Sequence, residues 1–231
     1  MAPHRTTLSE VTPRNLPSNP LALDNVALNH FLDHCHRRKH PARSDIFRPG
    51  DEASSLYYVV SGSLSVISEE SDGRELVLGY INAGDFIGEM GLYIKSEKRS
   101  VLLRTRTACD LAELSYERLY QLFSGPLATE CPKILYAIGA QLSKRLLETS
   151  RKASRLAFLD VTGRISRTLL DLCQEPDALS HPQGTQIRVS RQELARIVGC
   201  SREMAGRVLK QLQLDGKLHA RGKTVVVYGT R

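Results

Sequence analysis

The stretch from Ser190 to Leu212 constrains the fold of this chain most, because it has the pattern of two short helices joined by a tight turn. Ser190, followed three residues later by Glu193, predicts a capping box at the start of the first helix. Gly199 interrupts the pattern where a tight turn requires a positive φ, and Ser201 can cap the second helix. The spacing therefore predicts a helix-turn-helix.

The second of these helices separates an apolar stripe from a charged face. Apolar residues at helical spacing form the stripe: Ala205, Val208, Leu209 and Leu212. Arginine can donate two parallel hydrogen bonds to guanine, and glutamate can accept one from the cytosine amino group. We therefore predict that base edges are read by Arg202, Glu203 and Arg207. The alternative is an ordinary helical hairpin with a solvated charged face.

Charge along the chain also points to a polyanion. Residues 1–150 hold 17 Lys and Arg against 18 Asp and Glu, whereas residues 151–231 hold 15 against 7. A basic surface kept for solubility would explain the net charge of +7 but not this asymmetry. Polar and basic side chains around the two helices are predicted to contact DNA phosphates: Ser190, Arg191, Gln192, Ser201, Lys210 and Lys223.

Between Ile46 and Leu122 the apolar pattern changes to a period of two, interrupted by turn signals such as Asp72-Gly73. Many short strands at this spacing predict an antiparallel sandwich or roll, and with the helices they give an α+β fold. Residues 1–24 are rich in Pro, Thr, Ser and Asn, and are predicted to form a mobile tail. A short amphipathic helix is expected from Asn25 to Cys35.

A longer helix is predicted from about Lys133 to Leu156. Its apolar residues recur three and four positions apart, among them Leu135, Ile138, Leu142, Leu146 and Leu156. At ~1.5 Å per residue this helix would span roughly 35 Å. The stripe suits a coiled-coil-like seam between two copies of the chain. The alternative is a helix that packs only on its own roll.

Three segments resemble the catabolite activator (CRP) branch of the CRP/FNR regulators: Gly199 to Lys210, Leu156 to Ile165, and the ending from Gly222 to Arg231. The resemblance runs from about residue 34 to the end. It implies a double-stranded β-roll of the cyclic-nucleotide-binding type over residues 25–131, a long dimerisation helix and hinge over 132–158, and a winged helix-turn-helix over 159–231. The implied function is that of a homodimeric transcription regulator that binds and bends palindromic double-stranded DNA.

A candidate ligand pocket surrounds Gly88 and Arg99. The glycine permits close backbone approach, and Arg99 with Ser100 can hold a phosphate through charge-assisted hydrogen bonds. From these residues alone, a turn with a surface salt bridge is an equally good interpretation. The resemblance implies Gly88 and Glu89 at a ribose, Arg99 and Ser100 at a cyclic phosphate, and Thr149 and Ser150 at a purine.

Two effectors, cAMP and cyclic di-GMP, are both compatible with the sequence. One subgroup of the branch responds to cyclic di-GMP, which lowers its DNA binding, and it typically carries a glutamate at the position of Ser100. A carboxylate there would repel a cyclic phosphate, so the Arg99-Ser100 pair favours cAMP, while the overall likeness to the subgroup keeps cyclic di-GMP open. An architectural DNA-binding protein without ligand control is the alternative from another class.

The resemblance further implies that RNA polymerase is contacted by two surfaces. One is a Pro- and Gly-bearing loop that contains Ser180 and His181. The other is a patch on the roll formed by His36, Arg38 and Arg118, of which the two arginines keep only basic character.

Several functions are disfavoured by the residues that the chain carries. Its five cysteines are scattered and none is spaced like a zinc or iron–sulfur set, so no metal cofactor is expected. Reduced thiols suit a cytoplasmic protein. An 18-residue apolar run and a signal-peptide pattern are both absent, so nothing points to a membrane. Without a nucleophile–base constellation or a Walker-type loop, we do not expect an enzyme.

Overall fold

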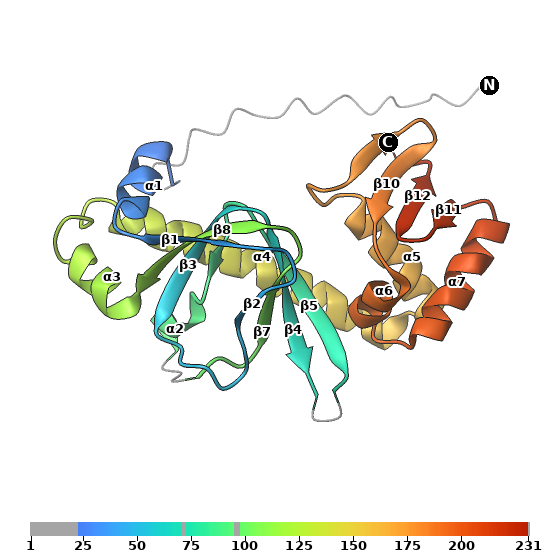
Figure 1. The fold of residues 1–231 in the computed structure, drawn as a ribbon, viewed down its shortest axis with the longest axis horizontal. Helices are drawn as coiled ribbons and strands as arrows, with labels where there is room; N and C mark the ends of the chain where they lie inside the picture. The colour runs from blue at the N-terminus through green and yellow to red at the C-terminus, as the bar shows by residue number, and fades with distance from the viewer. Residues whose placement is uncertain (1–22, 71–72, 95–97, 231) are drawn as a thin grey trace, which may run out of the picture.

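The computed structural model describes residues 23–70, 73–94 and 98–230. A β-roll occupies the left of Figure 1, a long helix runs behind it, and a second α+β unit lies on the right. The predicted N-terminal tail lies almost entirely outside the described residues. Within these ranges no helix is long and apolar enough to cross a membrane.

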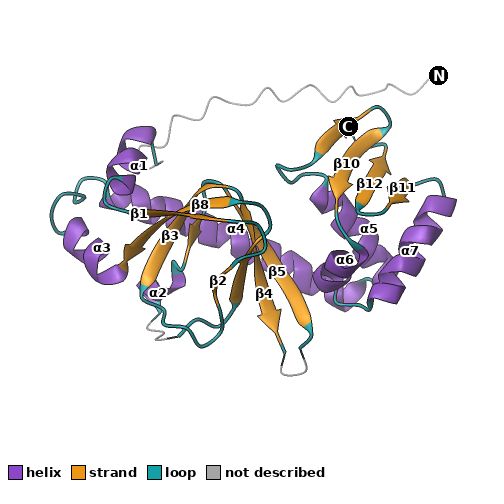
Figure 2. Cartoon of the chain, in the orientation of Figure 1, coloured by secondary structure: helices purple, strands orange, loops and turns teal. Residues whose placement is uncertain are grey.

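The roll consists of two four-stranded antiparallel sheets, as the period of two predicted. One has the order β1-β8-β3-β6, with β1 His36–His40, β8 Cys109–Ser115, β3 Ser55–Ser61 and β6 Phe86–Ile87. The other has the order β2-β7-β4-β5, with β2 Asp45–Phe47, β7 Leu102–Thr105, β4 Ser63–Glu69 and β5 Glu75–Asn82. Their facing side chains, among them Val59, Leu64, Leu103 and Leu111, make one apolar core. Figure 2 shows the strands of the roll in orange, with the long helix behind them in purple.

Three short helices belong to the roll: α1 Asn25–Leu32, α2 Met90–Tyr93 and α3 Tyr116–Phe123. Asp24 caps α1 by accepting a hydrogen bond from the backbone N–H of Ala27 at 2.8 Å. The helix predicted to reach Cys35 ends at Leu32 instead, because the N–H groups of His34 and Cys35 bond three residues back and β1 then begins at His36.

The long helix α4 covers Cys131–Phe158, two residues more at each end than predicted. Its apolar residues form two rows rather than one. Ile134 and Ile138 are fully buried against the roll of the same chain, with Leu142 partly buried beside them. Leu146, in contrast, keeps 69 % of its surface exposed. The prediction of a single seam was therefore wrong for Ile138, because this side chain already fills the roll's own apolar cluster.

The C-terminal unit has the order α5 Val161–Leu172, β9 Leu179–His181, β10 Gly184–Arg188, α6 Arg191–Val198, α7 Arg202–Leu214, β11 Leu218–Arg221 and β12 Thr224–Tyr228. Helices α6 and α7 form the predicted helix-turn-helix, with Gly199 at φ 70° between them. The hydroxyls of Ser190 and Ser201 cap these helices, at 3.1 and 3.2 Å. The wing turns at Gly222, where φ is 63°. The α+β prediction is confirmed.

Candidate nucleic-acid interface and ligand cavity

Helix α7 presents a polar face to solvent and an apolar face to its own unit. The predicted base-reading residues Arg202, Glu203 and Arg207 are all exposed, as is Lys210. Their opposite neighbours, among them Ala205 and Leu209, are buried with residues of α5 and α6. The exposed face of α7 therefore carries arginines that can donate hydrogen bonds to guanine and a glutamate that can accept one from cytosine.

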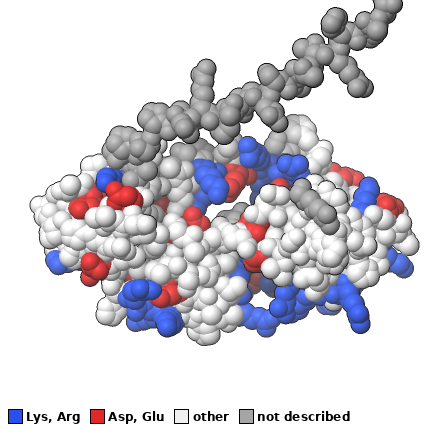
Figure 3. All heavy atoms as spheres, turned by 90° about the horizontal axis from the view of Figure 1, so that it is seen from above, with Lys and Arg blue, Asp and Glu red and all other residues white. Residues whose placement is uncertain are grey.

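The side chain of Arg191, the first residue of α6, lies beside Gly206 of α7. Its Cδ is 3.5 Å from the place where a Cβ on Gly206 would sit, which is an ordinary van der Waals distance, so Arg191 of α6 packs beside α7 at this position. Arg191 and Gln192 are exposed at the start of α6, and Lys223 is exposed in the turn of the wing. Lys and Arg side chains gather along the lower edge of this half of the molecule in Figure 3.

A cavity of about 870 Å³ lies between the roll, α4 and the C-terminal unit. Five of the six predicted ligand-binding residues line it: Gly88, Glu89, Arg99, Ser100 and Thr149. Ser150, at the next position of α4, is exposed and is not among the lining residues. Within one chain, the structure therefore brings together five of the six residues.

Arg99 is held deep in the roll at 9 % exposure. Its Nη2 donates to the carbonyl of Ser55 at 2.7 Å, its Nη1 donates to the Tyr116 hydroxyl at 3.3 Å, and the guanidinium lies 4.5 Å from the centre of the Phe47 ring. The buried Nε–H has no hydrogen-bond partner among the described residues. A buried donor on a cation is a group that an anionic ligand could satisfy.

Glu89, at 5 % exposure, is paired with Arg145 of α4 at 2.6 Å. The same guanidinium donates to the carbonyl of Phe86 at 2.8 Å. Gln141, one turn earlier, bonds both the N–H and the carbonyl of Phe86. Arg145 was missed by the sequence analysis, although it stands four residues before Thr149, one helical turn away. Through these two contacts Arg145 links helix α4 to the pocket residue Glu89 and to strand β6.

Tyr116 is a second residue that the sequence analysis missed. Its hydroxyl donates to the carbonyl of Gly88 at 2.6 Å, and a Cβ added to Gly91 would lie 2.4 Å from that hydroxyl. Gly88 itself has φ 83°. The two glycines therefore serve a close approach between the backbone and a tyrosine. Burial raises the pKa of Tyr116, which keeps it a hydrogen-bond donor.

The far end of the cavity lies between α4 and α5 and contains several cations. Lys152, Arg155 and Arg164 contribute to its lining. Arg155 pairs with Asp171 of α5, and the Lys152 ammonium donates to the carbonyl of Val77 on β5. Burial lowers the pKa of Lys152 to about 8. Carboxylates of Glu148, Asp171 and Glu175 line the same cavity, so this end carries both charges.

The residues assigned to polymerase contact lie in two regions. His36 and Arg38 are exposed on β1 at the edge of its sheet, and Arg118 is exposed on α3. Ser180 and His181 lie on β9 in the C-terminal unit. In the described ranges no three His, Cys, Asp or Glu side chains are grouped as metal ligands would be.

Comparison with known families assigns both halves of the molecule. The model of the cyclic nucleotide-binding domain matches residues 37–125, and that of bacterial regulatory proteins of the crp family matches residues 187–218. The CRP-like protein Clp of Xanthomonas euvesicatoria pv. vesicatoria is 68 % identical over 231 residues, covering all of both chains. This chain belongs to the CRP family. It is a transcription regulator and not an enzyme, as the sequence predicted.

Solved structures of CRP-family regulators agree with this fold. A structure of CLP from Xanthomonas campestris, described as a c-di-GMP responsive global regulator, is 70 % identical with a TM-score of 0.86, and the match covers 90 % of this chain and all of that one. A CRP/FNR regulator of Thermus thermophilus, TTHA1359, is similar in fold, with a TM-score of 0.69 at 24 % identity over 83 % of this chain and 93 % of the other. Because residues 37–125 match the cyclic nucleotide-binding domain, the effector class of this CRP-family member is a cyclic nucleotide.

Proposed function

We propose that this CRP-family regulator is a homodimer that binds a palindromic promoter site and is controlled by cAMP. The observation that carries the DNA-reading part is the exposed face of α7, where Arg202, Glu203 and Arg207 stand together in a basic unit. Each subunit would place α7 in the major groove, with half-sites about one helical turn apart.

The dimer is supported by the outer row of α4. Leu135, Leu146 and Leu147 are exposed at 37 %, 69 % and 52 %. A second copy of α4 would cover these apolar side chains, and its two-fold symmetry would match that of a palindrome. Such a regulator would act in the cytoplasm beside RNA polymerase, which the surfaces around His36 and His181 would contact.

The cAMP assignment is supported at the roll end of the cavity. The unpaired Nε–H of Arg99 and the hydroxyl of Ser100 would donate hydrogen bonds to the cyclic phosphate. Glu89 would accept a hydrogen bond from the ribose hydroxyl, and Thr149 would contact the adenine. Ser150, exposed on α4, would reach the adenine bound to the partner subunit. Ligand binding would then shift the long helices and the hinge.

Cyclic di-GMP is a second candidate, as an inhibitor of DNA binding. The cavity extends past Thr149 to Lys152 and Arg155, so a ligand with two phosphates would find cations at both ends. The Xanthomonas campestris relative responds to this dinucleotide.

Calorimetry tests the two candidates. With cAMP, the wild type should release heat, Arg99→Leu should release none because the phosphate loses its countercharge, and Ser100→Glu should release little because of repulsion. Micromolar binding of cyclic di-GMP with no heat from cAMP would reverse the assignment. Base reading is tested separately by site selection, in which Glu203→Ala should relax preference at one base pair.

A further inference from the structure

Helix α6 of the helix-turn-helix packs against strand β5 of the roll. Ile197 of α6 and Tyr80 of β5 pack together on a small apolar cluster that contains Val77. Beside it, the Leu76 side chain comes within 3.8 Å of the place where a Cβ on Gly199 would sit, in the turn that follows α6. This contact joins the two units independently of the connection between α4 and α5.

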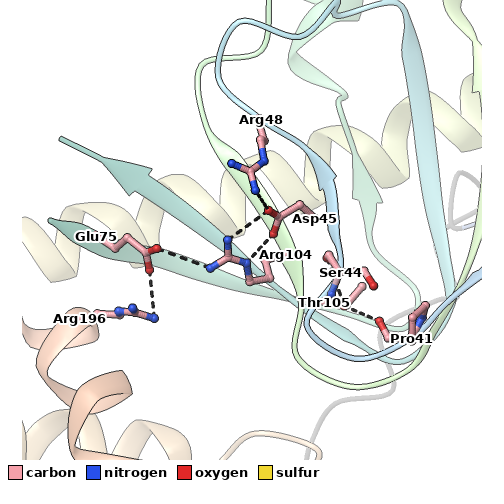
Figure 4. Close-up of polar contacts among 8 residues, drawn as sticks. All are labelled: Pro41, Ser44, Asp45, Arg48, Glu75, Arg104, Thr105 and Arg196. Atoms are coloured by element: carbon pink, nitrogen blue, oxygen red, sulfur yellow. Dashed lines mark hydrogen bonds and ion pairs between the residues drawn. The ribbon is translucent and has the colours of Figure 1, made fainter. Parts of the chain in front are cut away.

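An ion pair flanks this apolar contact. Glu75 of β5 forms an ion pair with Arg196 of α6, with Oε2 and Nη1 3.0 Å apart, and the Glu75 side chain is only 13 % exposed. On the roll side Glu75 faces Arg104 at 3.5 Å, which in turn holds Asp45 at 2.5 Å. Figure 4 shows the resulting row of alternating charges from Arg48 to Arg196. Asp45 and Glu75 both contact Arg104, so the roll itself supplies a partner that orients Glu75 beside α6.

Tyr80 and Arg106 form a second polar group on the same surface. The Arg106 guanidinium lies 4.0 Å from the centre of the Tyr80 ring. The Tyr80 hydroxyl donates to Glu193 of α6 at 3.3 Å, and Arg106 pairs with Asp177 at 3.2 Å and with Glu193 at 3.7 Å. Glu193 was predicted to complete a capping box with Ser190, but its carboxylate reaches the roll instead.

The contact leaves the DNA-facing side chains open. Helix α7 lies on the side of α6 away from β5 (Figure 1). Arg191 and Gln192 of α6 are exposed, whereas Glu193, Arg196 and Ile197 of the same helix are partly buried. One side of α6 therefore contacts the roll while another side remains available to a DNA backbone.

We propose that Glu75 and Arg106 are positioning residues, which hold α6 on the roll so that α7 is presented in one orientation relative to α4. Across the connection itself the side chains of Phe158 and Leu159 are exposed at 83 % and 38 %, so the restraint there comes from the Arg155–Asp171 pair between α4 and α5, and the contact of α6 with β5 is a second attachment. This inference rests on the proposed DNA-reading role of α7. Without the contact, the C-terminal unit samples several orientations, and DNA binds only the competent fraction.

The test is a double-mutant cycle of Glu75→Gln and Arg196→Gln, with DNA affinity measured by fluorescence anisotropy on a palindromic duplex. We expect Glu75→Gln to weaken binding about fivefold. The double variant should bind no more weakly than Arg196→Gln alone, because the pair is already broken. Small-angle X-ray scattering should show a larger radius of gyration for Glu75→Gln than for the wild type.

Glu117→Gln is the matched control, since it removes the same charge from an exposed position of α3, which takes no part in the contact with α6. It should leave both measurements unchanged. Tyr80→Phe removes only the hydroxyl that bonds Glu193 and keeps the ring beneath Arg106, so it gives a smaller loss in a protein that folds normally. Circular dichroism melts establish that each variant is folded.

Three results would overturn the proposal: unchanged affinity and radius in Glu75→Gln, tighter DNA binding in that variant, or strictly additive losses in the cycle. Tighter binding would mean that the contact holds α7 in an orientation that binds DNA poorly. Failure of the wild type to prefer the palindrome would contradict the proposed function instead. The scattering data would still report whether Glu75 holds α6.

Discussion

Leu146→Glu should convert the dimer into folded monomers. Leu146 is 69 % exposed in the single chain, so a second α4 would bury roughly 100 Å² of apolar surface per copy. At ~25 cal/mol per Å², losing this from both copies costs about 5 kcal/mol of association free energy. Two glutamates at the seam add repulsion and desolvation. The dimer dissociation constant should therefore rise by about a thousandfold or more.

Sedimentation velocity over a dilution series measures this directly. Ile138→Glu is the contrasting variant, because Ile138 is fully buried in the roll's own cluster and its substitution should unfold the roll. Leu142 is a poorer choice, since it packs partly on the same cluster. An intact dimer of Leu146→Glu at micromolar concentration would refute the assignment of the outer row of α4 as the seam.

Three further substitutions test the interface, the pocket and the roll. Arg191→Ala should weaken binding to every DNA sequence alike and reduce the slope of log K against log salt by about one, whereas lost sequence preference at unchanged slope would make it a base reader. Arg145→Leu should lower the free energy of unfolding by about 3 kcal/mol, because it strands the buried carboxylate of Glu89, and an unchanged urea midpoint would contradict this. The Arg104 guanidinium holds the pKa of Asp45 below its usual value, so this carboxylate stabilises the fold above about pH 4 and loses that effect as the pH falls further. The difference in urea midpoint between wild type and Asp45→Asn should therefore shrink from about pH 7 to about pH 3, and an equal difference at both would count against the pair.

The helix-turn-helix was predictable because its signals are local. Ser190, Gly199 and Ser201 act on the backbone within a few residues of their own positions, and the apolar stripe of α7 needs only helical geometry. The roll was predictable in class for the same reason, since alternation and turn residues are properties of short segments. The choice of a double-stranded β-roll came from the resemblance alone, and the order of its strands was not predicted.

Contacts between distant segments could not be predicted. The apolar pattern of α4 does not distinguish Ile138, which packs on the roll, from Leu146, which does not, because both rows recur at helical spacing. Nothing local marks Arg145 as the partner of Glu89, or Arg196 as the partner of Glu75. Such ion pairs depend on how two units pack, and long charged side chains are otherwise expected in solvent.

The most direct test of the central claim is the affinity for a palindromic duplex and a scrambled duplex, measured with no nucleotide, with cAMP and with cyclic di-GMP. A cyclic-nucleotide-controlled regulator of the CRP type should prefer the palindrome, and one of the two nucleotides should change that preference. The Arg99-Ser100 pocket predicts that cAMP is the nucleotide that does so. Equal affinity for both duplexes would contradict the DNA-reading role of α7, and a preference that neither nucleotide alters would contradict control through the cavity.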